Sequence, residues 1–271
     1  MTMRLLILAV LCFWAVPAVP ALAQGEPPTA SRCIAFVEGP ARIMPAALPA
    51  AVAAPEVEIT YVTHSTFRLH TPAGVVIATD YAGYFGSGPP PDIATMNHAH
   101  ETHYTDYPDP AIRHVLRGWN PEGSGPAKHH LVLEDVLVRN VSTDIRSWGG
   151  LVEPWGNSIF IFETADLCIG HLGHLHHMPT RDQFAQIGRL DIVFAAVDGG
   201  LTLDHPTMIS VLKELRASLV IPMHYFGRGS LETFLAGMAA EFEIRVHDSA
   251  TTTVTLPGLP RRPTVLVLPG Y

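Results

Sequence analysis

The chain has 271 residues, of which 48% are hydrophobic and 15% are charged. This composition is typical of a globular protein and excludes a disordered or fibrous one. With 25 acidic and 17 basic residues the net charge is -8, and lysine and arginine form no cluster, so we expect no nucleic-acid partner. Histidine is unusually frequent, with 15 copies, and seven of them fall in two short clusters.

The N-terminal segment, residues 1–23, has the features of a secretory signal peptide. Arg4 precedes an apolar run over 5–16, and the small-residue pattern Ala-Leu-Ala at 21–23 ends the segment. The apolar run is too short for a membrane span and prolines follow it, which favours a cleaved signal over a retained anchor. We therefore expect a periplasmic or secreted protein with no stable membrane insertion after cleavage.

The rest of the chain predicts one α/β domain. Residues 24–55 form an Ala- and Pro-rich lead-in, and 56–271 form the domain. Its first half contains short β-rich runs separated by turn residues, which indicates antiparallel strands. In its second half helices alternate with apolar strands, and capping residues stand at Thr180 and Asp204. We expect helices over about 180–188, 204–216 and 230–241, and buried strands over about 191–197 and 218–224.

Cys33 and Cys168 are the two cysteines that remain after signal cleavage. In an oxidising compartment they can pair, and closing so long a loop would stabilise the fold by about 4 kcal/mol. Alternatively, Cys168 is a buried thiol in an apolar strand and Cys33 is free. The sequence favours the second arrangement, because nothing in it shows that the two residues meet.

The stretch TMNHAHETHYTD carries three histidines directly after a predicted strand. Successive residues of a strand point to opposite faces, so His98 and His100 project to the same side, about 6 to 7 Å apart. His103 follows after a change of direction. Zinc binds histidine nitrogens at about 2.0 to 2.1 Å, and three imidazoles at a strand end can surround one such ion. The pattern favours a metal site over three unrelated histidines.

The second cluster is GHLGHLHHMP, again at a strand end, and one more histidine, His224, follows the apolar strand in VIPMHYF. A lone histidine in that place is normally a packed core residue. His64, after the first strand, either lines the cleft or packs in the core. The second cluster contributes four further candidates, which are His171, His174, His176 and His177.

The motifs occur in the order THSTFRL, TDY, HxHxxH, HLGH, IGRLDIVFAAVDGG and LVIPMHY. In this order they resemble the metallo-β-lactamase-fold hydrolases, in particular the branch of the ascorbate-phosphate lactonase and its relatives. The resemblance covers about residues 57–247. It implies a four-layer αββα sandwich, an α/β fold in which loops along one edge of two sheets hold the metal.

The resemblance also implies a set of metal ligands. The HxHxDH motif of the family falls on His98, His100, Thr102 and His103, its later Gly-Asp falls on Gly173 and His174, and its final histidine falls on His224. The family places an intermediate histidine near 141–146, where this chain has only Asp144. His171 is a further candidate ligand.

Three positions depart from the family pattern, at Thr102, Asp144 and His174. A bridging carboxylate binds two cations through its two oxygens, which a neutral imidazole with one free lone pair cannot do. A tight dinuclear centre is therefore disfavoured. The expected arrangement is one tightly bound zinc at His98, His100 and His174, with a second, weaker divalent ion at His103 and His224.

A zinc held by three histidines with an open position lowers the pKa of a bound water to about 7. We therefore expect an exported hydrolase in which histidine-bound zinc activates water to attack a small-molecule ester, lactone or phosphodiester. Glu101 and Asp106 are candidate catalytic carboxylates that relay a proton, or else solvated loop residues. Asp80 corresponds to a family residue that orients a ligand histidine.

The main alternative is a catalytically silent periplasmic metal-binding protein of the same fold, because loss of ligands is how such a site would fall silent. A redox di-iron centre is disfavoured, since such centres use carboxylate ligands. A β-lactamase stays open, because a fold alone does not specify a substrate. The sequence leaves the substrate and the oligomeric state undetermined.

Overall fold

The computed structural model describes residues 29–34, 53–97, 101–123, 125–147 and 149–270. The described residues from Ser31 onward belong to one compact unit. None of their helices has the length and hydropathy of a membrane span. The expected signal peptide and most of the lead-in lie outside the described residues, so export stays a prediction.

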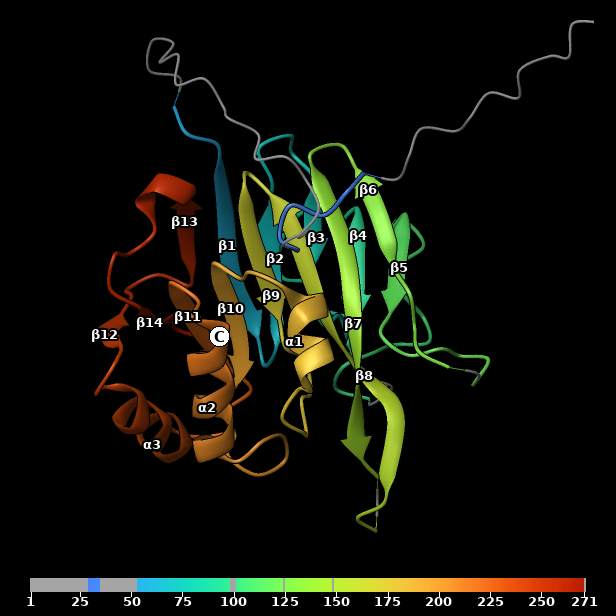
Figure 1. Cartoon of the computed structure of the whole chain (residues 1–271). Helices are drawn as coiled ribbons and strands as arrows, with labels where there is room; N and C mark the ends of the chain where they lie inside the picture. The colour runs from blue at the N-terminus through green and yellow to red at the C-terminus, as the bar shows by residue number, and fades with distance from the viewer. Residues whose placement is uncertain (1–28, 35–52, 98–100, 124, 148, 271) are drawn as a thin grey trace, which may run out of the picture. The chain divides into compact units, whose positions relative to one another are not determined.

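The first sheet has six strands in the order β13-β1-β2-β3-β4-β5 (Figure 1). β13, β1, β2 and β3 pair in antiparallel fashion, whereas β3, β4 and β5 run parallel. The strands are β1 (Glu56–Thr63), β2 (Thr66–His70), β3 (Val76–Ala78), β4 (Ile93–Met96), β5 (His114–Arg117) and β13 (Thr251–Thr255).

The second sheet has eight strands in the order β12-β14-β11-β10-β9-β8-β7-β6. Its early strands form an antiparallel meander from β6 to β9, and β9, β10, β11, β14 and β12 run parallel. The strands are β6 (His130–Leu133), β7 (Val136–Arg146), β8 (Val152–Thr164), β9 (Leu167–His171), β10 (Ile192–Ala196), β11 (Leu219–Met223), β12 (Glu243–Val246) and β14 (Thr264–Val267).

Three α-helices connect the parallel strands of the second sheet, and a short 3-10 helix, η1 (Leu256–Gly258), follows β13. α1 (Arg181–Ile187) and α2 (His205–Leu215) begin at the predicted caps, Thr180 and Asp204. α3 (Arg228–Met238) begins two residues before the expected start at residue 230. The Ser230 hydroxyl donates to the backbone carbonyls of Val197 and Asp198 and so fastens α3 to the loop after β10.

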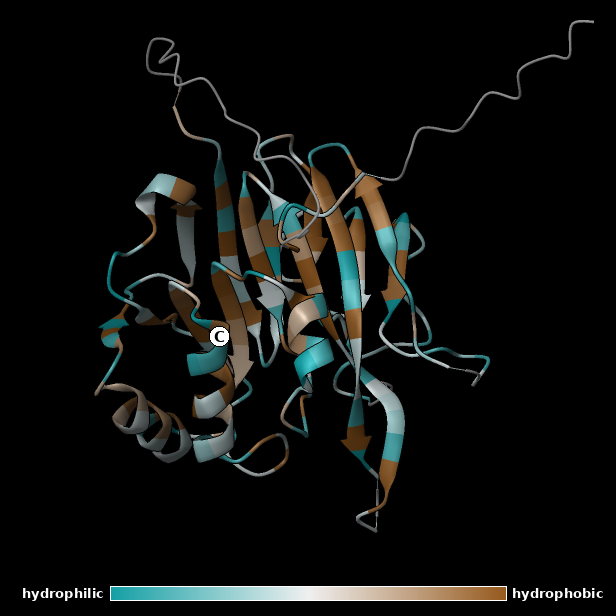
Figure 2. Cartoon of the chain, in the orientation of Figure 1, coloured by the Kyte–Doolittle hydropathy of each residue, from teal (hydrophilic) through white to brown (hydrophobic). Residues whose placement is uncertain are grey.

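The main core lies between the two sheets, because the strands alternate inward apolar residues with outward ones. Phe67 of β2 stacks on Phe194 of β10 with ring centroids 4.1 Å apart, and both side chains are fully buried. Figure 2 shows the matching hydrophobic stretches along the strands of both sheets. This core fixes the relative position of the strand ends that carry the polar residues described below.

The predicted α/β sandwich is confirmed, with two mixed sheets and a helical layer. A second apolar core joins the outer face of the second sheet to the helices, through residues such as Val193, Val211 and Phe234. On the first sheet, loop residues including Tyr81, Phe85 and Tyr104 cover the outer face. This layer is formed by loops because the connection between β3 and β4 is rich in glycine and proline, which do not sustain a helix.

Cys33 and Cys168 form a disulfide, so the free-thiol arrangement that the sequence favoured is wrong. Both residues are buried. The segment before Cys33 is held by further contacts with β8, since Ser31 Oγ and Arg32 N donate to the carboxylate of Glu163 at 2.6 and 2.7 Å. The pairing could not be predicted because 135 positions separate the two cysteines and only the folded sheet brings them together.

Replacing both cysteines by alanine is expected to lower the free energy of unfolding by about 2 to 5 kcal/mol, because the long loop gains freedom in the unfolded chain. Guanidinium unfolding monitored by circular dichroism measures this change. A reductant should lower the stability of the wild-type protein to that of the variant and leave the variant unaffected. Equal stability of the two oxidised proteins would contradict the prediction.

Candidate metal centre

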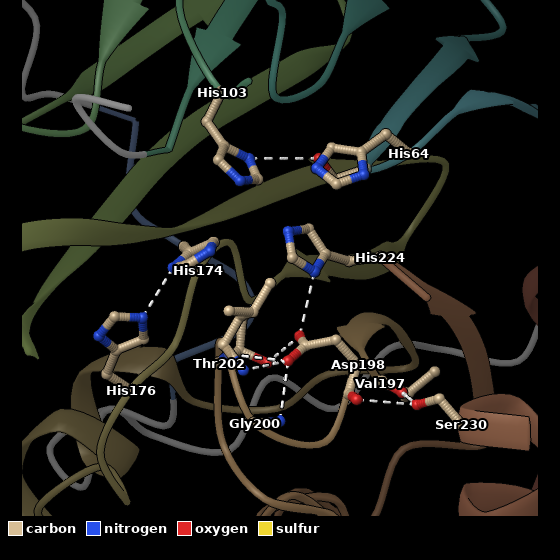
Figure 3. A network of polar contacts seen from close by, with 12 residues as sticks. His64, His103, His174, His176, Val197, Asp198, Gly200, Thr202, His224 and Ser230 are labelled. Atoms are coloured by element: carbon tan, nitrogen blue, oxygen red, sulfur yellow. Dashed lines mark hydrogen bonds and ion pairs between the residues drawn. The ribbon is translucent and has the colours of Figure 1, made fainter. Parts of the chain in front are cut away.

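Histidine and aspartate side chains meet at one edge of the sandwich, where several strands end (Figure 3). In sheets with parallel strands, the loops that follow the carboxyl ends converge and commonly carry ligand sites. Each apolar strand ends at this edge, and the polar residues that follow it in the sequence therefore lie there. The residues are His64 from the β1–β2 turn, Asp80 after β3, His103 after β4, His174 after β9, Asp198 after β10 and His224 after β11.

Three imidazoles, those of His64, His103 and His224, offer ligand nitrogens that all lie within 4.8 Å of one another. The ring centroids of His64 and His224 are 4.2 Å apart, and that of His103 lies 5.2 Å from each. Two nitrogens bound to one zinc at about 2.0 to 2.1 Å are at most about 4.2 Å apart. Small side-chain rotations therefore bring the three rings within reach of a single ion.

The hydrogen bonds of His103 and His224 put both rings in the form that binds a metal. His103 Nδ1 lies 2.5 Å from Asp80 Oδ2, and His224 Nδ1 lies 3.0 Å from Asp198 Oδ2. A carboxylate accepts, so each Nδ1 carries a proton, and in the neutral form of each ring Nε2 then carries the lone pair. Carboxylates support metal-binding histidines in this way, fixing the tautomer and raising the basicity of the ligand nitrogen.

Asp80 is fully buried and ionised. Burial by itself would raise the pKa of this carboxyl group, but the charge and hydrogen bond of His103 outweigh burial and hold the pKa well below its usual range. Ser65 Oγ also donates to Asp80, and the backbone N–H of Asn97 donates to its other oxygen at 3.1 Å. A negative charge is therefore fixed behind His103.

Asp198 supports His224 in the same way, as a carboxylate that accepts from the ring Nδ1. Its Oδ1 accepts from three successive backbone N–H groups, those of Gly200, Leu201 and Thr202, and the Thr202 hydroxyl donates to Oδ2 at 2.6 Å. Burial opposes ionisation, but the hydrogen bonds from His224 and Thr202 hold the pKa of Asp198 well below its usual range. The loop after β10 is thus shaped around one carboxylate, as Figure 3 shows.

His64 completes the group as a neutral ring. Burial, followed by the nearby His224 and His103, lowers its pKa to about 4. Among the described residues, its buried Nε2 atom has no hydrogen-bond partner. A buried polar atom without a partner is costly in a folded protein, and a metal ion would satisfy it. The donor set therefore fits a divalent ion.

Strained backbone is concentrated at this edge. His64, Asp80 and His224 have φ angles of 46°, 49° and 53°, in the left-handed region that side chains other than glycine rarely adopt. Such conformations cost about 1 to 3 kcal/mol each and cluster at functional sites. These conformations lower the stability of the fold, and they orient the three side chains toward a common point.

The domain model for the beta-lactamase superfamily matches residues 58–224, which is more than half of the chain. The chain belongs to this superfamily. No curated protein matches it. The matched segment begins in β1 and ends at His224, so it contains all three imidazoles of the group.

Several solved structures share the fold. A proposed Zn-dependent hydrolase of the metallo-β-lactamase superfamily from Thermotoga maritima is 22% identical, with a TM-score of 0.59, over 79% of this chain and 100% of that one. A proposed metal-dependent hydrolase from Parabacteroides distasonis is 14% identical, with a TM-score of 0.54, over 68% and 89%. Igni18, a metallo hydrolase from Ignicoccus hospitalis, is 16% identical, with a TM-score of 0.50, over 68% and 91%.

This superfamily member brings only some of the predicted ligands together. His103 and His224 lie in the group, whereas His98 and His100 lie outside the described residues, so their role stays a prediction. His174 borders the group, with its ring centroid 4.7 Å from that of His103. Asp144 is not part of the group, and its carboxylate accepts from the backbone N–H of Trp155 in the β7–β8 hairpin.

His171, also a predicted ligand, lies outside the group of three imidazoles, and both of its ring nitrogens make hydrogen bonds within the fold. Nε2 lies 2.8 Å from the carbonyl of Ser65 and must donate to it. Nδ1 then accepts, and it lies 3.0 Å from Asn97 Nδ2 and 3.1 Å from the backbone nitrogen of Gly173. The ring is fully buried, and its hydrogen bond to Ser65 links the second sheet to the first.

Glu101 and Asp106 are exposed on the loop between β4 and β5, and neither belongs to the imidazole group. Their proposed role in proton transfer stays a prediction. Thr102, where the family pattern has aspartate, is also exposed. The position that lost its carboxylate thus faces solvent in the described structure.

Two roles were missed in the sequence. The sequence patterns leave the place of His64 open between the cleft wall and the core, and they give Asp198 no role. The signal for Asp198 was present, since Asp80 and Asp198 both follow fully buried apolar strands at the same edge. Nothing in the sequence shows that the β1–β2 turn lies beside the end of β11, where the His64 carbonyl accepts from His224 N at 2.8 Å.

Asp80→Asn is expected to weaken zinc binding by about 10- to 100-fold, because the amide would present N–H groups to the donors that now hold the carboxylate. Competition with a chromophoric chelator measures the dissociation constant. Asp92→Asn is a matched control, since the Asp92 carboxylate bonds Arg113 and the Val76 backbone and has no described contact with His64, His103 or His224. If both variants bind zinc equally well, Asp80 does not support a ligand.

Proposed function

We propose that this chain is an exported metal-dependent hydrolase whose metal centre is built on His64, His103 and His224. The observation that carries the proposal is the pair of carboxylate-supported imidazoles, His103 on Asp80 and His224 on Asp198, beside the neutral ring of His64. A packed core has no use for two buried aspartates that each fix a histidine tautomer. Histidines that bind a metal are commonly supported by carboxylates in this way.

Zinc is the ion that suits the donors best. Neutral imidazoles suit zinc and other first-row transition ions, whereas magnesium and calcium prefer oxygen ligands. Three neutral ligands leave the double positive charge of the ion uncompensated. The bound ion would supply Lewis acidity toward a carbonyl or phosphoryl group and toward the attacking water.

We base the proposed substrate class on the chemistry of the bound ion and on the aromatic ring of Phe226 beside the imidazoles. Esters, lactones and phosphodiesters contain an electrophilic centre that such an ion activates. Phe226 is 67% exposed, and its ring centroid lies 5.5 Å from that of His64 and 5.2 Å from that of His224. This aromatic face favours a substrate with an apolar group next to the reacting bond, and a lactone is one such compound.

Two further observations support the assignment. Of the three solved structures described above, two are of proposed metal-dependent hydrolases and one is of a metallo hydrolase, all at low sequence identity. The Cys33–Cys168 disulfide is typical of proteins that fold in an oxidising compartment and so supports a periplasmic or secreted location.

Removal of the metal tests the function. Protein purified with zinc should hydrolyse at least one member of a panel of an aryl ester, a γ-lactone and a bis-aryl phosphodiester, and dialysis against a strong chelator should abolish that activity. Adding zinc or cobalt should restore it. Activity that survives complete metal removal would overturn the proposal, and a zinc-loaded protein inert on every substrate would favour the catalytically silent metal-binding protein.

A further inference from the structure

His171, at the end of β9, is a fully buried titratable residue that the proposed hydrolysis does not use. Its ring lies edge-on to the rings of Phe67 and Phe194, with centroids 6.2 and 5.8 Å away. These two rings stack on each other in the core between the sheets. The core therefore holds the imidazole in place.

The hydrogen bonds of His171 require a neutral ring with the proton on Nε2. Nε2 lies 2.8 Å from the backbone carbonyl of Ser65, which can only accept. Nδ1 lies 3.1 Å from the backbone nitrogen of Gly173, whose N–H can only donate, and 3.0 Å from Asn97 Nδ2. Burial favours the same state, because it lowers the pKa of the imidazole. His171 therefore donates on one side of its ring and accepts on the other.

The Ser65 carbonyl belongs to the β1–β2 turn that carries His64. His64 has a φ of 46°, a conformation that is unfavourable for a residue with a side chain and persists only where the surroundings support it. Its own carbonyl accepts from Tyr61 Oη at 2.7 Å and from His224 N at 2.8 Å. With the bond from His171 to Ser65, donors outside the turn hold both of its carbonyls.

The two sides of the His171 ring differ in what they hold. On the Nδ1 side, Asn97 has other partners, since its Nδ2 also donates to the Ser158 carbonyl at 3.0 Å and its backbone N–H donates to Asp80 at 3.1 Å. On the Nε2 side, His171 is the only donor to the Ser65 carbonyl among the described contacts. Ser65 is buried, so loss of this donor would leave the carbonyl unpaired and release the turn.

We propose that His171 is a positioning residue of the metal centre, which holds the Ser65 carbonyl and thereby sets the place of the His64 ring. The inference rests on the proposed function, because it takes His64 as a zinc ligand. Loss of a group that orients a ligand from behind typically weakens metal binding by about 10- to 100-fold. His171 exerts this effect through the backbone, without contact with the ion.

His171→Asn and His171→Gln separate the two sides of the ring. The asparagine amide lies near the place of Nδ1 and is too short to reach Ser65, whereas the glutamine amide reaches the place of Nε2 and can donate to the Ser65 carbonyl. We expect the zinc dissociation constant to rise by about 10- to 100-fold in His171→Asn and to stay within about threefold of wild type in His171→Gln. Chelator competition measures both. Equal constants for the two variants would overturn the proposal.

A double-mutant cycle with His64→Ala tests whether the effect passes through that ring. In the His64→Ala background, His171→Asn should change the zinc dissociation constant by less than about threefold. A loss as large as the one in the wild-type background would contradict the proposal.

Asp135→Asn is the structural control. Asp135 links the segment after β2 to the end of β8, because its carboxylate accepts from Thr71 at 2.6 Å and from Thr164 at 3.3 Å. This substitution should lower the midpoint of guanidinium unfolding and leave zinc affinity unchanged. A loss of zinc affinity equal to that of His171→Asn would mean that any loosening of the sandwich weakens the centre, and the specific role of His171 would be wrong.

Spectra of the wild-type protein test the tautomer without any variant. In protein labelled with 15N-histidine, His171 is assigned by nuclear Overhauser effects to the rings of Phe67 and Phe194, and two-bond 1H–15N correlations then locate its proton. We expect the proton on Nε2 with and without zinc. A proton on Nδ1 would overturn the proposal even if neither variant folded.

Zinc affinity also separates this inference from the proposed function. If no substrate is hydrolysed, but His171→Asn loses zinc and His171→Gln keeps it, the hydrolase function is wrong and the positioning role stands. If His64→Ala binds zinc as tightly as wild type, the proposed centre is wrong and the role of His171 fails with it.

Discussion

His224→Ala should lower the affinity of the centre for zinc by more than about 100-fold, a larger loss than removal of a supporting group produces. The variant loses one of three imidazoles and leaves the Asp198 carboxylate, whose side chain is 2% exposed, without its ring partner. Hydrolysis should fall to the level of the metal-free protein. Chelator competition and the visible spectrum of cobalt-loaded protein report affinity and coordination number.

His64→Ala distinguishes a three-histidine centre from a two-histidine one. If His64 is a ligand, its loss should weaken zinc binding to a similar extent and change the cobalt spectrum. His247→Ala is the control, because His247 lies in a loop after β12 and its ring bonds only to Ser249 among the described contacts. Unchanged zinc affinity in His224→Ala would remove the basis of the proposed centre.

Arg139→Ala should lower the free energy of unfolding by about 3 to 5 kcal/mol, the usual cost of breaking a buried ion pair. Arg139 Nε donates to Glu163 at 2.7 Å, and its two terminal nitrogens donate to the carbonyls of Gln186 and Ile187 at the end of α1, each at 2.7 Å. Arg139 and Glu163 are both buried. The substitution removes the charged partner of a buried carboxylate, which keeps only the donors of Ser31 and Arg32, and leaves the two carbonyls without their Arg139 donor.

Arg113→Ala is the matched control. Arg113 pairs with Asp92 at the surface, and exposed pairs contribute at most about 1 kcal/mol. Guanidinium unfolding of both variants, monitored by circular dichroism, compares the two losses. Equal losses would mean that the Arg139 network does not anchor the N-terminal segment and α1.

The stability from Glu163 should also depend on pH. Burial opposes ionisation, but the hydrogen bonds from Ser31 and Arg139 outweigh it and hold the pKa of Glu163 below its usual range. A carboxyl group with a lowered pKa in the folded state stabilises the protein above its unfolded pKa of about 4.3, and this contribution is lost as the pH falls through the folded value. The difference between wild type and Arg139→Ala should therefore shrink in acid below about pH 4.

Much of the fold was predictable because its signals are local. Alternating apolar residues place β1 and β2, the capping residues Thr180 and Asp204 start two helices, and apolar runs place β10 and β11. The same locality placed His103 and His224 at strand ends. Each of these features depends on residues within a few positions of one another, so the sequence alone determines them.

The tertiary structure decided what each polar side chain does. His171 and His224 both follow apolar strands, yet a carbonyl occupies Nε2 of the first and a carboxylate holds Nδ1 of the second. His64 lies with the other two imidazoles, and Cys33 pairs with Cys168, only because distant strands pack together. A histidine binds metal through the nitrogen that its neighbours leave unprotonated, and those neighbours come from segments that only folding brings together.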